Sequence, residues 1–389
     1  MEEKAAQPKL SKGKRIKFVL STLVFLLVII FIISEILLSV FHYQSTYDKL
    51  KDFSLDQAKW WACDSASGPR YVANQMKDID SNSYKDEMWY FKRLKMVNNA
   101  GYHDADDFVD IPAGSDSLKV LIDGDSFTWG ASADIGSSYV DVFESDIKKV
   151  YPSLVWNTGI PATGTNHAIF TTKKFLPLQK SNYVVLGFFV GNDFEDNLLP
   201  FDRLVFNGGN GCYNLYDYDK NFTPYKISQR EMCKKVTGSY PVNELNFFQK
   251  LVDRSRVLTF FGDMKDKLVN RLSGNKKRAA DEAYKKTEAY IKELNAYVKE
   301  NNAELIVLVI PAEADVKEKS TQYQNIIKIL NESAIKHVDN TGLFTADDYM
   351  KTGGGHWKNS GHIKAGHELS KLVLEEILQK GQKSFRKNQ

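Results

Sequence analysis

The residues most suited to catalysis are in a small polar turn that contains a serine and directly follows an apolar run. The run Leu118–Ile122 is followed by Asp-Gly-Asp and then by Ser126. A short stretch of Val and Leu bounded by Gly and Asp predicts a buried strand. Open α/β sheets bind their ligands at the carboxyl ends of strands. Ser126 is therefore our candidate nucleophile, and other parts of the chain should supply a base and an oxyanion site.

Two later stretches carry groups of the required types. His356 lies in a Gly-rich loop just before the last predicted helix, where an imidazole can reach over the strand ends, so we expect it to be the base. For the oxyanion of a tetrahedral intermediate we expect the backbone N–H groups of Ser126 and Ala162 and the side-chain amide of Asn192. These residue types predict acyl transfer through a serine ester.

Short apolar runs predict the elements that position these groups. Further buried strands are expected at Leu154–Trp156, Tyr183–Val190 and Leu305–Ile310. Between them lie helical patterns, one of which begins at Ser138 with the spacing of a capping box. Strands that alternate with helices are typical of a parallel sheet with right-handed crossovers. The sequence therefore predicts an α/β fold.

Four blocks, in this order, resemble the SGNH, or GDSL, hydrolase family. They are Gly124–Phe127 around the nucleophile, Asn157–Thr165, Gly191–Asp193 and His356–His362, and the likeness runs with gaps from about Asn98 to the C-terminus. The resemblance implies a three-layer α/β/α flavodoxin-like sandwich with a parallel sheet. It also implies esterase, lipase, carbohydrate O-deacetylase or O-acyltransferase activity.

One departure from the family concerns the acid of the triad. The family places Asp two or three residues before the catalytic His, where this chain has Gly354 and Gly353. Loss of the charge of such a carboxylate costs about four orders of magnitude in rate elsewhere. A backbone carbonyl could hold the ring in a Ser–His dyad, or Asp347 or Asp348 could act as a displaced acid. The remaining alternative is an inactive site.

The N-terminus combines basic residues with a long uncharged run. Residues 1–17 contain six Lys or Arg, and Phe18–Ser34 contains no charge. The segment 18–41 exceeds the roughly 20 apolar residues needed to cross a bilayer. A cleaved signal peptide is the alternative, but the run is long for one and no A-x-A-like site follows. We expect a single-pass anchor in the cell membrane, with the N-terminus cytoplasmic and the catalytic domain outside the cytoplasm.

The predicted domain plan follows from these patterns. It comprises a cytoplasmic N-terminus (1–17), an anchor (18–41), a stalk and N-terminal extension (42–117), a hydrolase domain (118–380) with an insertion at about 194–245, and a polar tail (381–389). Outside the cytoplasm, Cys212 and Cys233 could form a disulfide worth about 3 kcal/mol. Cys63 would be left over, and three free thiols are the alternative.

Composition limits the classes of partner. The chain has 389 residues, of which 43% are hydrophobic and 26% charged, as in globular proteins. The net charge of +3 is spread along the chain, so a nucleic-acid partner is not indicated. His362 and His367 follow His356 without a Cys or carboxylate in register, and we expect neither a metal nor another cofactor.

The expected function is that of an anchored serine esterase. Its substrates would be O-acyl esters, and in particular O-acetyl esters, on small molecules or on envelope or exported glycans. A glycan O-acetyltransferase would use the same acyl-enzyme, so the sequence does not separate the two. The missing Asp favours a third hypothesis, an inactive binding protein that works with envelope polysaccharide assembly proteins.

Overall fold

A computed structural model gives the structure of the chain. It describes residues 11–51, 61–64, 68–71, 96–104, 107–108, 117–161, 163–198, 216–218, 224–226, 245–272, 275–339, 341–351 and 355–387. The chain forms two compact units, which are described separately. One comprises Met1–Asp52 and Cys233–Asn275, and the other comprises Phe53–Met232 and Lys276–Gln389.

A five-stranded parallel sheet forms the centre of the second unit. Its strands are β3 (Leu118–Gly124), β4 (Ser153–Asn157), β5 (Tyr183–Phe189), β8 (Glu304–Ile310) and β9 (Lys336–Asp339). Their order in the sheet is β4-β3-β5-β8-β9, and every neighbouring pair is parallel. This is the flavodoxin-like order, in which the chain reverses direction across the sheet at β3 and ligands bind near the strand ends.

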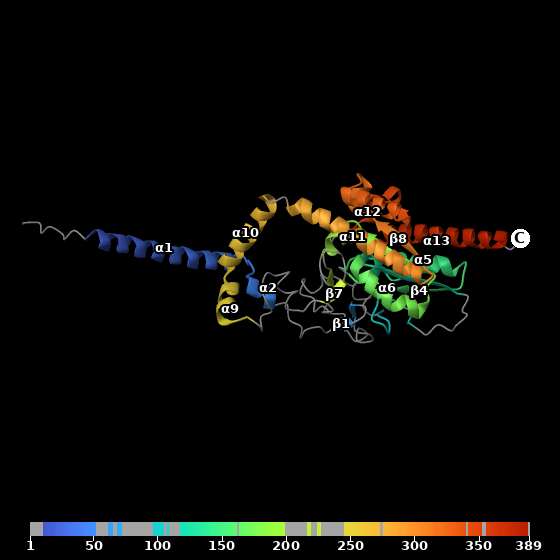
Figure 1. Cartoon of the computed structure of the whole chain (residues 1–389), viewed down its shortest axis with the longest axis horizontal. Coiled ribbons are helices and arrows are strands. Elements are labelled where there is room, and N and C mark those ends of the chain that lie inside the picture. Colours follow the sequence, from blue (N-terminus) through green and yellow to red (C-terminus); the bar gives the residue numbers. More distant parts are fainter. Residues whose placement is uncertain are drawn as a thin grey trace, which may run out of the picture. The chain divides into compact units, whose positions relative to one another are not determined.

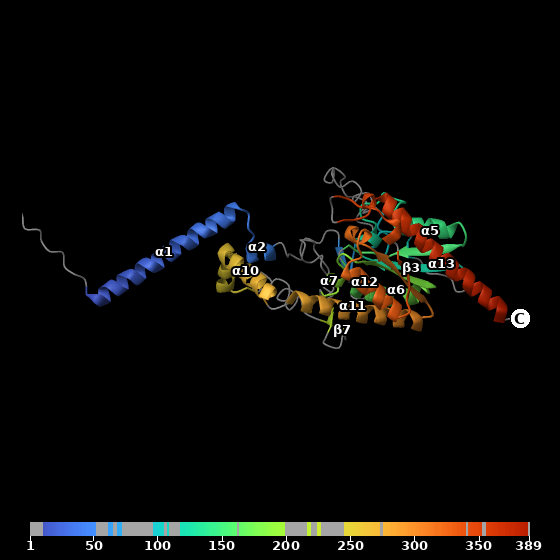
Figure 2. The same ribbon diagram turned by 90° about the horizontal axis from the view of Figure 1, so that it is seen from above.

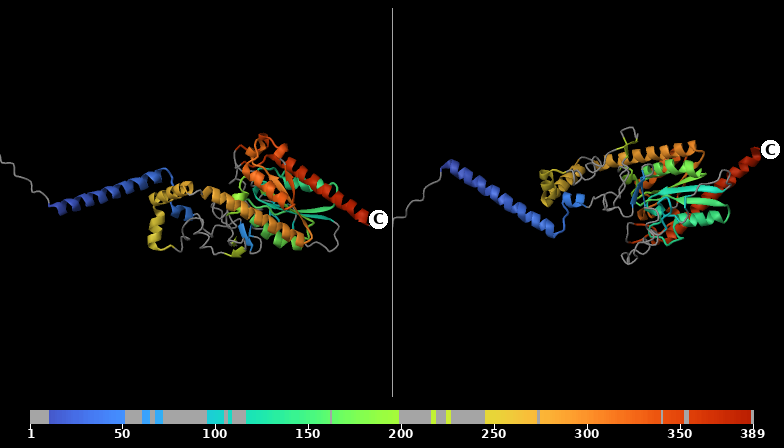
Figure 3. Two further views of the ribbon diagram at one scale, coloured as in Figure 1. Left: turned by 45° about the horizontal axis from the view of Figure 1, so that its top comes forward. Right: turned by 90° about the horizontal axis from the view of Figure 1, so that it is seen from below.

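Helices cover both faces of this sheet. α5 (Tyr139–Lys148) and α13 (Asn359–Lys387) lie on one face, and α6 (Thr165–Gln179), α11 (Asn275–Glu300) and α12 (Thr321–Glu332) lie on the other. The views from above and below show the sheet between these two sets (Figures 2 and 3). The predicted three-layer α/β/α fold is confirmed.

Alternation along the strands explains why two cores form. In β3, Val120 and Ile122 pack into the core beneath α5 and α13, whereas Leu121 packs into the core beneath α6, α11 and α12. Successive side chains of a strand point to opposite faces, so an apolar run is buried on both sides. At Ser138 the predicted capping box is present, because its side chain accepts from the N–H of Asp141 and Asp141 bonds in return.

Shorter elements complete the second unit. They are β1 (Trp61–Asp64), β2 (Gly68–Tyr71), α4 (Ser126–Trp129), α7 (Asp193–Asp196), β6 (Tyr216–Tyr218), β7 (Pro224–Lys226), and the 3-10 turns η6 (Glu313–Val316), η7 (Thr341–Leu343) and η8 (Ala346–Asp348). β6 and β7 pair antiparallel within the predicted insertion. Cys212 and Cys233, the predicted disulfide partners, lie outside the described residues.

The first unit joins segments far apart in the sequence. It contains α1 (Lys12–Val40), α2 (Thr46–Lys51), α9 (Phe247–Arg254) and α10 (Arg256–Leu272). The sequence plan placed α9 and α10 in the hydrolase domain, but their contacts are with α1, α2 and each other. α1 is a single long helix (Figure 1), long and apolar enough to cross a membrane. Most of its large apolar side chains are exposed.

The last helix is also longer than expected. α13 continues to Lys387, into the segment 381–389 that the sequence plan left as a polar tail.

Candidate active site

Ser126 is the first residue of α4, in a tight turn after β3. The side chain of Asp125 caps this helix by accepting a hydrogen bond of 2.9 Å from the N–H of Phe127. Asp125 therefore acts as an Asx residue of the turn. Gly130 ends the helix in the left-handed conformation, with φ of 89°. Ser126 thus lies at the carboxyl edge of the sheet, as predicted, and is half-buried.

Two glycines allow this turn to sit directly against its neighbours. A Cβ on Gly124 would lie 2.2 Å from the hydroxyl of Thr128, and one on Gly159 would lie 2.6 Å from the backbone N of Trp129. Real Cβ atoms do not approach so closely, so these positions require glycine. The Thr128 hydroxyl is 2.7 Å from that of Tyr139 at the start of α5. The helix that carries Ser126 is therefore held from several sides.

His356 reaches Ser126 from the other end of the chain. Its Nε2 lies 2.7 Å from Oγ of Ser126, a normal hydrogen-bond distance. The imidazole also contacts the ring of Phe127, with 5.0 Å between ring centroids. The backbone of the His356 loop is tied down, since the N–H of Met350 donates to the carbonyl of His356 at 2.8 Å. The structure thus brings together the two residues expected to be nucleophile and base.

Asn192 lies at the carboxyl end of β5, the strand beside β3. Its side-chain Nδ2 donates to Asp196 at 2.5 Å, and its Oδ1 is buried without a hydrogen-bond partner among the described residues. Asp196, one helical turn further on, therefore determines which way the amide of Asn192 points. Ala162, the other expected oxyanion donor, lies outside the described residues.

The two candidate displaced acids lie in η8. The carboxylate of Asp348 is buried and accepts from Lys364 at 2.7 Å and from the N–H of Thr345 at 2.8 Å. Burial alone would raise the pKa of Asp348, but these hydrogen bonds hold it below its usual value. Asp347 is exposed on the same turn. Asp348 thus has a structural function as the acceptor for the N–H of Thr345, the N-cap of η8, and as the partner of Lys364.

Three buried carboxyl groups gather beside Ser126. They belong to Asp125, Asp193 and Asp196. Burial, together with the nearby charge of Asp196, raises the pKa of Asp125 to about 7. Burial and the charges of Asp125 and Asp196 raise the pKa of Asp193 well above its usual value. At a pH between the usual pKa of aspartate and these raised pKa values, the folded chain therefore keeps protons on Asp125 and Asp193 that the unfolded chain releases.

We expect Asp125→Asn to stabilise the chain at alkaline pH. Between about pH 4 and 7 the unfolded carboxyl loses its proton while the folded one keeps it, so wild-type stability falls as the pH rises. Asn keeps the capping oxygen and carries no charge. The variant should exceed wild type in free energy of unfolding by roughly 1–3 kcal/mol above pH 7. Thermal unfolding of the full chain at pH 5 and pH 8 measures this, and an equal or lower stability at pH 8 would contradict it.

The sequence did not reveal the polar groups beneath the turn. Asp123, at the end of β3, accepts from the Thr158 hydroxyl at 2.8 Å, and its other oxygen lies 3.6 Å from Nδ1 of the fully buried His167. Asn157 donates to the carbonyl of Thr128 at 2.8 Å. A polar residue at the end of a predicted buried strand was the only available signal for Asp123. His167 lies within a helix and gave none.

The other two C-terminal histidines have partners within the protein. His362 is fully buried, with Nε2 3.1 Å from the carbonyl of Ala131 and Nδ1 3.3 Å from the N–H of Tyr139. It joins the start of α13 to the segment between α4 and α5. His367 pairs with Asp146 at 2.5 Å. In the part of the chain that the structure describes, no three His, Cys, Asp or Glu residues are grouped as metal ligands would be.

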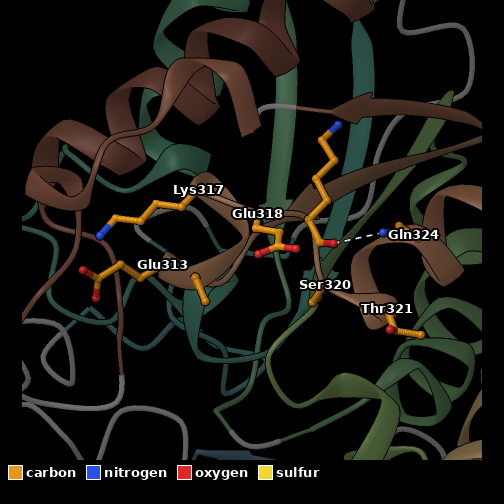
Figure 4. A pocket seen from close by; sticks show the side chains of 8 residues that line it. Glu313, Lys317, Glu318, Ser320, Thr321 and Gln324 are labelled. Carbon is orange, nitrogen blue, oxygen red and sulfur yellow. Dashed lines mark hydrogen bonds between the residues drawn. The ribbon is translucent and has the colours of Figure 1, made fainter.

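Two hollows lie beside the loops that follow β5 and β8. One, of about 720 Å³, lies between η6 and the start of α12 and carries charges of both signs, including Glu313, Lys317 and Glu318 (Figure 4). The second, of about 580 Å³, lies between α7, α11 and α12, and Phe194 and Tyr284 contribute to its largely apolar wall. Neither is lined by Ser126 or His356. The second adjoins the helix that begins directly after Asn192.

The fold and this site together define a flavodoxin-like α/β protein with a serine–histidine pair at the edge of its sheet. No protein-family profile matches the chain, and no curated protein sequence matches it. Among solved structures, it is similar to a two-domain esterase active on acetylated mannans, with 11% identity, a TM-score of 0.37 and coverage of 67% of this chain and 49% of that one. The chain thus spans about half the length of that esterase.

Two smaller proteins show a likeness over most of their own length. A lipase/acylhydrolase from Enterococcus faecalis is 12% identical, with a TM-score of 0.36 and coverage of 66% of this chain and 95% of that one. A variant of an acetyl-xylooligosaccharide esterase from Geobacillus is 15% identical, with a TM-score of 0.36 and coverage of 67% and 94%. Identities this low leave the chemistry to be judged from the residues of this chain.

Proposed function

We propose that this chain is a membrane-anchored serine esterase of the SGNH type that hydrolyses O-acyl esters outside the cytoplasm. The observation that supports it most is the distance of 2.7 Å between Oγ of Ser126 and Nε2 of His356, residues 230 positions apart in the sequence. A serine is activated when an adjacent imidazole can take its proton. The turn in which it stands exposes it at the sheet edge where ligands of this fold bind.

The reaction would proceed in two steps. Ser126 Oγ attacks the ester carbonyl while Nε2 of His356 takes its proton, and the protonated imidazole then gives that proton to the departing alcohol. The same imidazole then takes a proton from a water molecule that attacks the acyl carbon, and it gives this proton to Oγ of Ser126 as the bond from Oγ to that carbon breaks and the acid leaves. In both steps negative charge develops on the former carbonyl oxygen, where the N–H of Ser126 and the amide of Asn192 would stabilise it.

Asn192→Ala should lower kcat by about two orders of magnitude with little change in KM, because an oxyanion donor acts mainly in the transition state.

Asp196→Asn keeps the shape of the side chain that accepts from Nδ2 of Asn192 and removes its charge. We expect a smaller loss of kcat from that variant, about tenfold. Steady-state kinetics with p-nitrophenyl acetate measures both. An unchanged kcat for Asn192→Ala in a folded chain would remove Asn192 from the oxyanion site.

Membrane attachment is proposed from α1. The helix begins within the basic N-terminal segment and contains the uncharged run Phe18–Ser34, which favours a span with the N-terminus in the cytoplasm. The catalytic unit would then be outside the cytoplasm. Retention of residues 1–41 in the mature chain, measured by intact mass, separates an anchor from a cleaved signal peptide.

The acyl acceptor decides between hydrolase and transferase. We propose water as the acceptor and acetylated envelope or exported glycans as the substrates, because such esters lie on the expected side of the membrane. The test compares hydrolysis of p-nitrophenyl acetate by the full chain with and without an unacetylated oligosaccharide. Release of acetate at the same rate in both supports the esterase. Transfer of acetate to the sugar would show an O-acetyltransferase, and no turnover in either would favour the binding protein suggested by Gly353 and Gly354.

A further inference from the structure

The two helices α9 and α10 expose most of their large apolar side chains. In α9, Phe247 and Phe248 are 74% and 75% exposed, and in α10, Phe261 is 62% exposed. Soluble proteins seldom leave such side chains together at the surface unless they meet a partner. The further members of these two apolar faces, also exposed, are Leu251, Val252, Leu258, Met264 and Leu268.

α9 has its polarity reversed for a helix in water. Its side chains Gln249, Lys250 and Asp253 are half-buried, whereas Phe247 and Phe248 on the opposite side are exposed. In a helix that packs on a soluble core, the apolar stripe faces inward and the polar face meets the solvent. α9 therefore presents its apolar side outward, away from its half-buried polar residues.

The exposed apolar residues of α10 also form one stripe. Leu258, Phe261, Met264 and Leu268 follow one another at intervals of three and four residues. Such spacing places side chains on one face of a helix. α9 and α10, which carry these two apolar faces, are adjacent in the sequence and contact each other in the structure.

Hydrogen bonds attach the start of α10 to Glu35, near the C-terminal end of α1. Its first residues bond the carboxylate of Glu35, to which the N–H of Arg256 donates at 3.0 Å and the N–H of Val257 at 3.1 Å. The hydroxyl of Ser255 donates to the same carboxylate. The Arg256 guanidinium also donates to the carbonyl of Tyr43, just after α1, at 3.0 Å. Glu35 thus caps the N-terminus of α10.

The position of Glu35 gives the depth of this attachment. Six residues, Ile36–Phe41, separate Glu35 from the end of the predicted span, which corresponds to about 9 Å along the helix axis. Amphipathic helices at a membrane surface bury their apolar face by about 5–10 Å. If α1 spans the bilayer, the start of α10 is held at the depth at which such helices lie.

The charge of the two helices fits the same environment. The stretch Phe247–Leu272 contains six Lys or Arg residues and three Asp residues. A net positive charge beside an apolar stripe favours binding to a surface that carries anionic lipids. Arg254 lies over the ring of Tyr47, 4.6 Å from its centroid, and remains exposed.

We propose that α9 and α10 form a second membrane contact, an interfacial pair of helices that lies in the outer leaflet beside α1 with Phe247, Phe248, Phe261 and Leu268 inserted. The inference rests on the proposed span by α1 and is independent of the chemistry of Ser126. It assigns the segment 247–272 to the membrane surface, where the sequence alone placed it in the hydrolase domain.

The test is photo-crosslinking of the full chain in vesicles of phosphatidylcholine with added phosphatidylglycerol. p-Benzoyl-phenylalanine is introduced in place of Phe248, Phe261 or, as the matched control, Lys267, which lies about 120° around α10 from Phe261. After irradiation, intact mass detects a phospholipid adduct. We expect about tenfold more adduct from the two Phe positions than from Lys267.

Three outcomes would overturn the proposal. They are crosslinked dimers at Phe248 and Phe261 in place of lipid adducts, crosslinks to other parts of the same chain, and equal lipid yield at Lys267. Circular dichroism shows whether each variant is folded. Alkaline extraction of the same vesicles tests the anchor separately, since a chain released by alkali has no span and the inference fails with it. Hydrolysis of p-nitrophenyl acetate by these samples reports on the esterase independently of either result.

Discussion

Ser126→Ala will reduce hydrolysis of p-nitrophenyl acetate by about 10⁴-fold or more, to the level of buffer and binding effects alone. The reason is that, in the proposed mechanism, Oγ of Ser126 forms the bond to the acyl group, and this atom lies 2.7 Å from Nε2 of His356. The turn itself should persist, because its cap comes from Asp125 and its close contacts involve Thr128.

The control for this variant is Ser137→Ala, a half-buried serine on the loop between α4 and α5. It should keep wild-type kcat. Full activity of Ser126→Ala would show that another residue is the nucleophile. Loss of activity in both variants would point to damage of the loop and would not support a specific function of Ser126.

His356→Ala should lower kcat/KM by about 10³–10⁴-fold, because the serine would lose the group that takes its proton. In the wild type, protonation of the imidazole removes the base. We therefore expect kcat/KM to fall as the pH drops below about 6 to 7, the range in which histidine usually titrates. The variant should show no such fall.

The matched control is His367→Ala. This histidine is exposed on α13 and pairs with Asp146, away from Ser126. Its removal should leave both kcat/KM and the pH profile unchanged. A wild-type profile that stays flat down to pH 5 would exclude His356 as the base.

The strands of the sheet, and Ser126 and His356 as candidate residues, were accessible from the sequence because the patterns that mark them are local. Apolar runs such as Leu118–Ile122 mark strands, and the polar clusters after them mark strand ends. Parallel strands bring such ends to one edge of a sheet, which is why Ser126 and Asn192 were expected at the same edge. The loop that carries His356 could be placed because only a short segment separates it from α13.

Other features depend on contacts between distant segments, which leave no local pattern. Glu35 appeared only as a charge near the end of an apolar segment, yet it caps α10 more than 200 residues later. Asp348 was one of two possible displaced acids, and the sequence did not show that Lys364 donates to its carboxylate. The amphipathic pattern of α9 could not show that its apolar side faces outward, since periodicity identifies a face without saying what covers it.

The measurement that tests the central claim most directly is labelling of the purified full chain with a fluorophosphonate, with the modified residue located by peptide mass spectrometry. Such a probe reacts with a serine that a base and an oxyanion site activate, and it requires no knowledge of the substrate. We predict modification of Ser126 in the wild type and its loss in both Ser126→Ala and His356→Ala. A folded wild-type chain in which Ser126 stays unmodified, or one in which His356→Ala labels as well as wild type, would contradict the proposed serine–histidine mechanism.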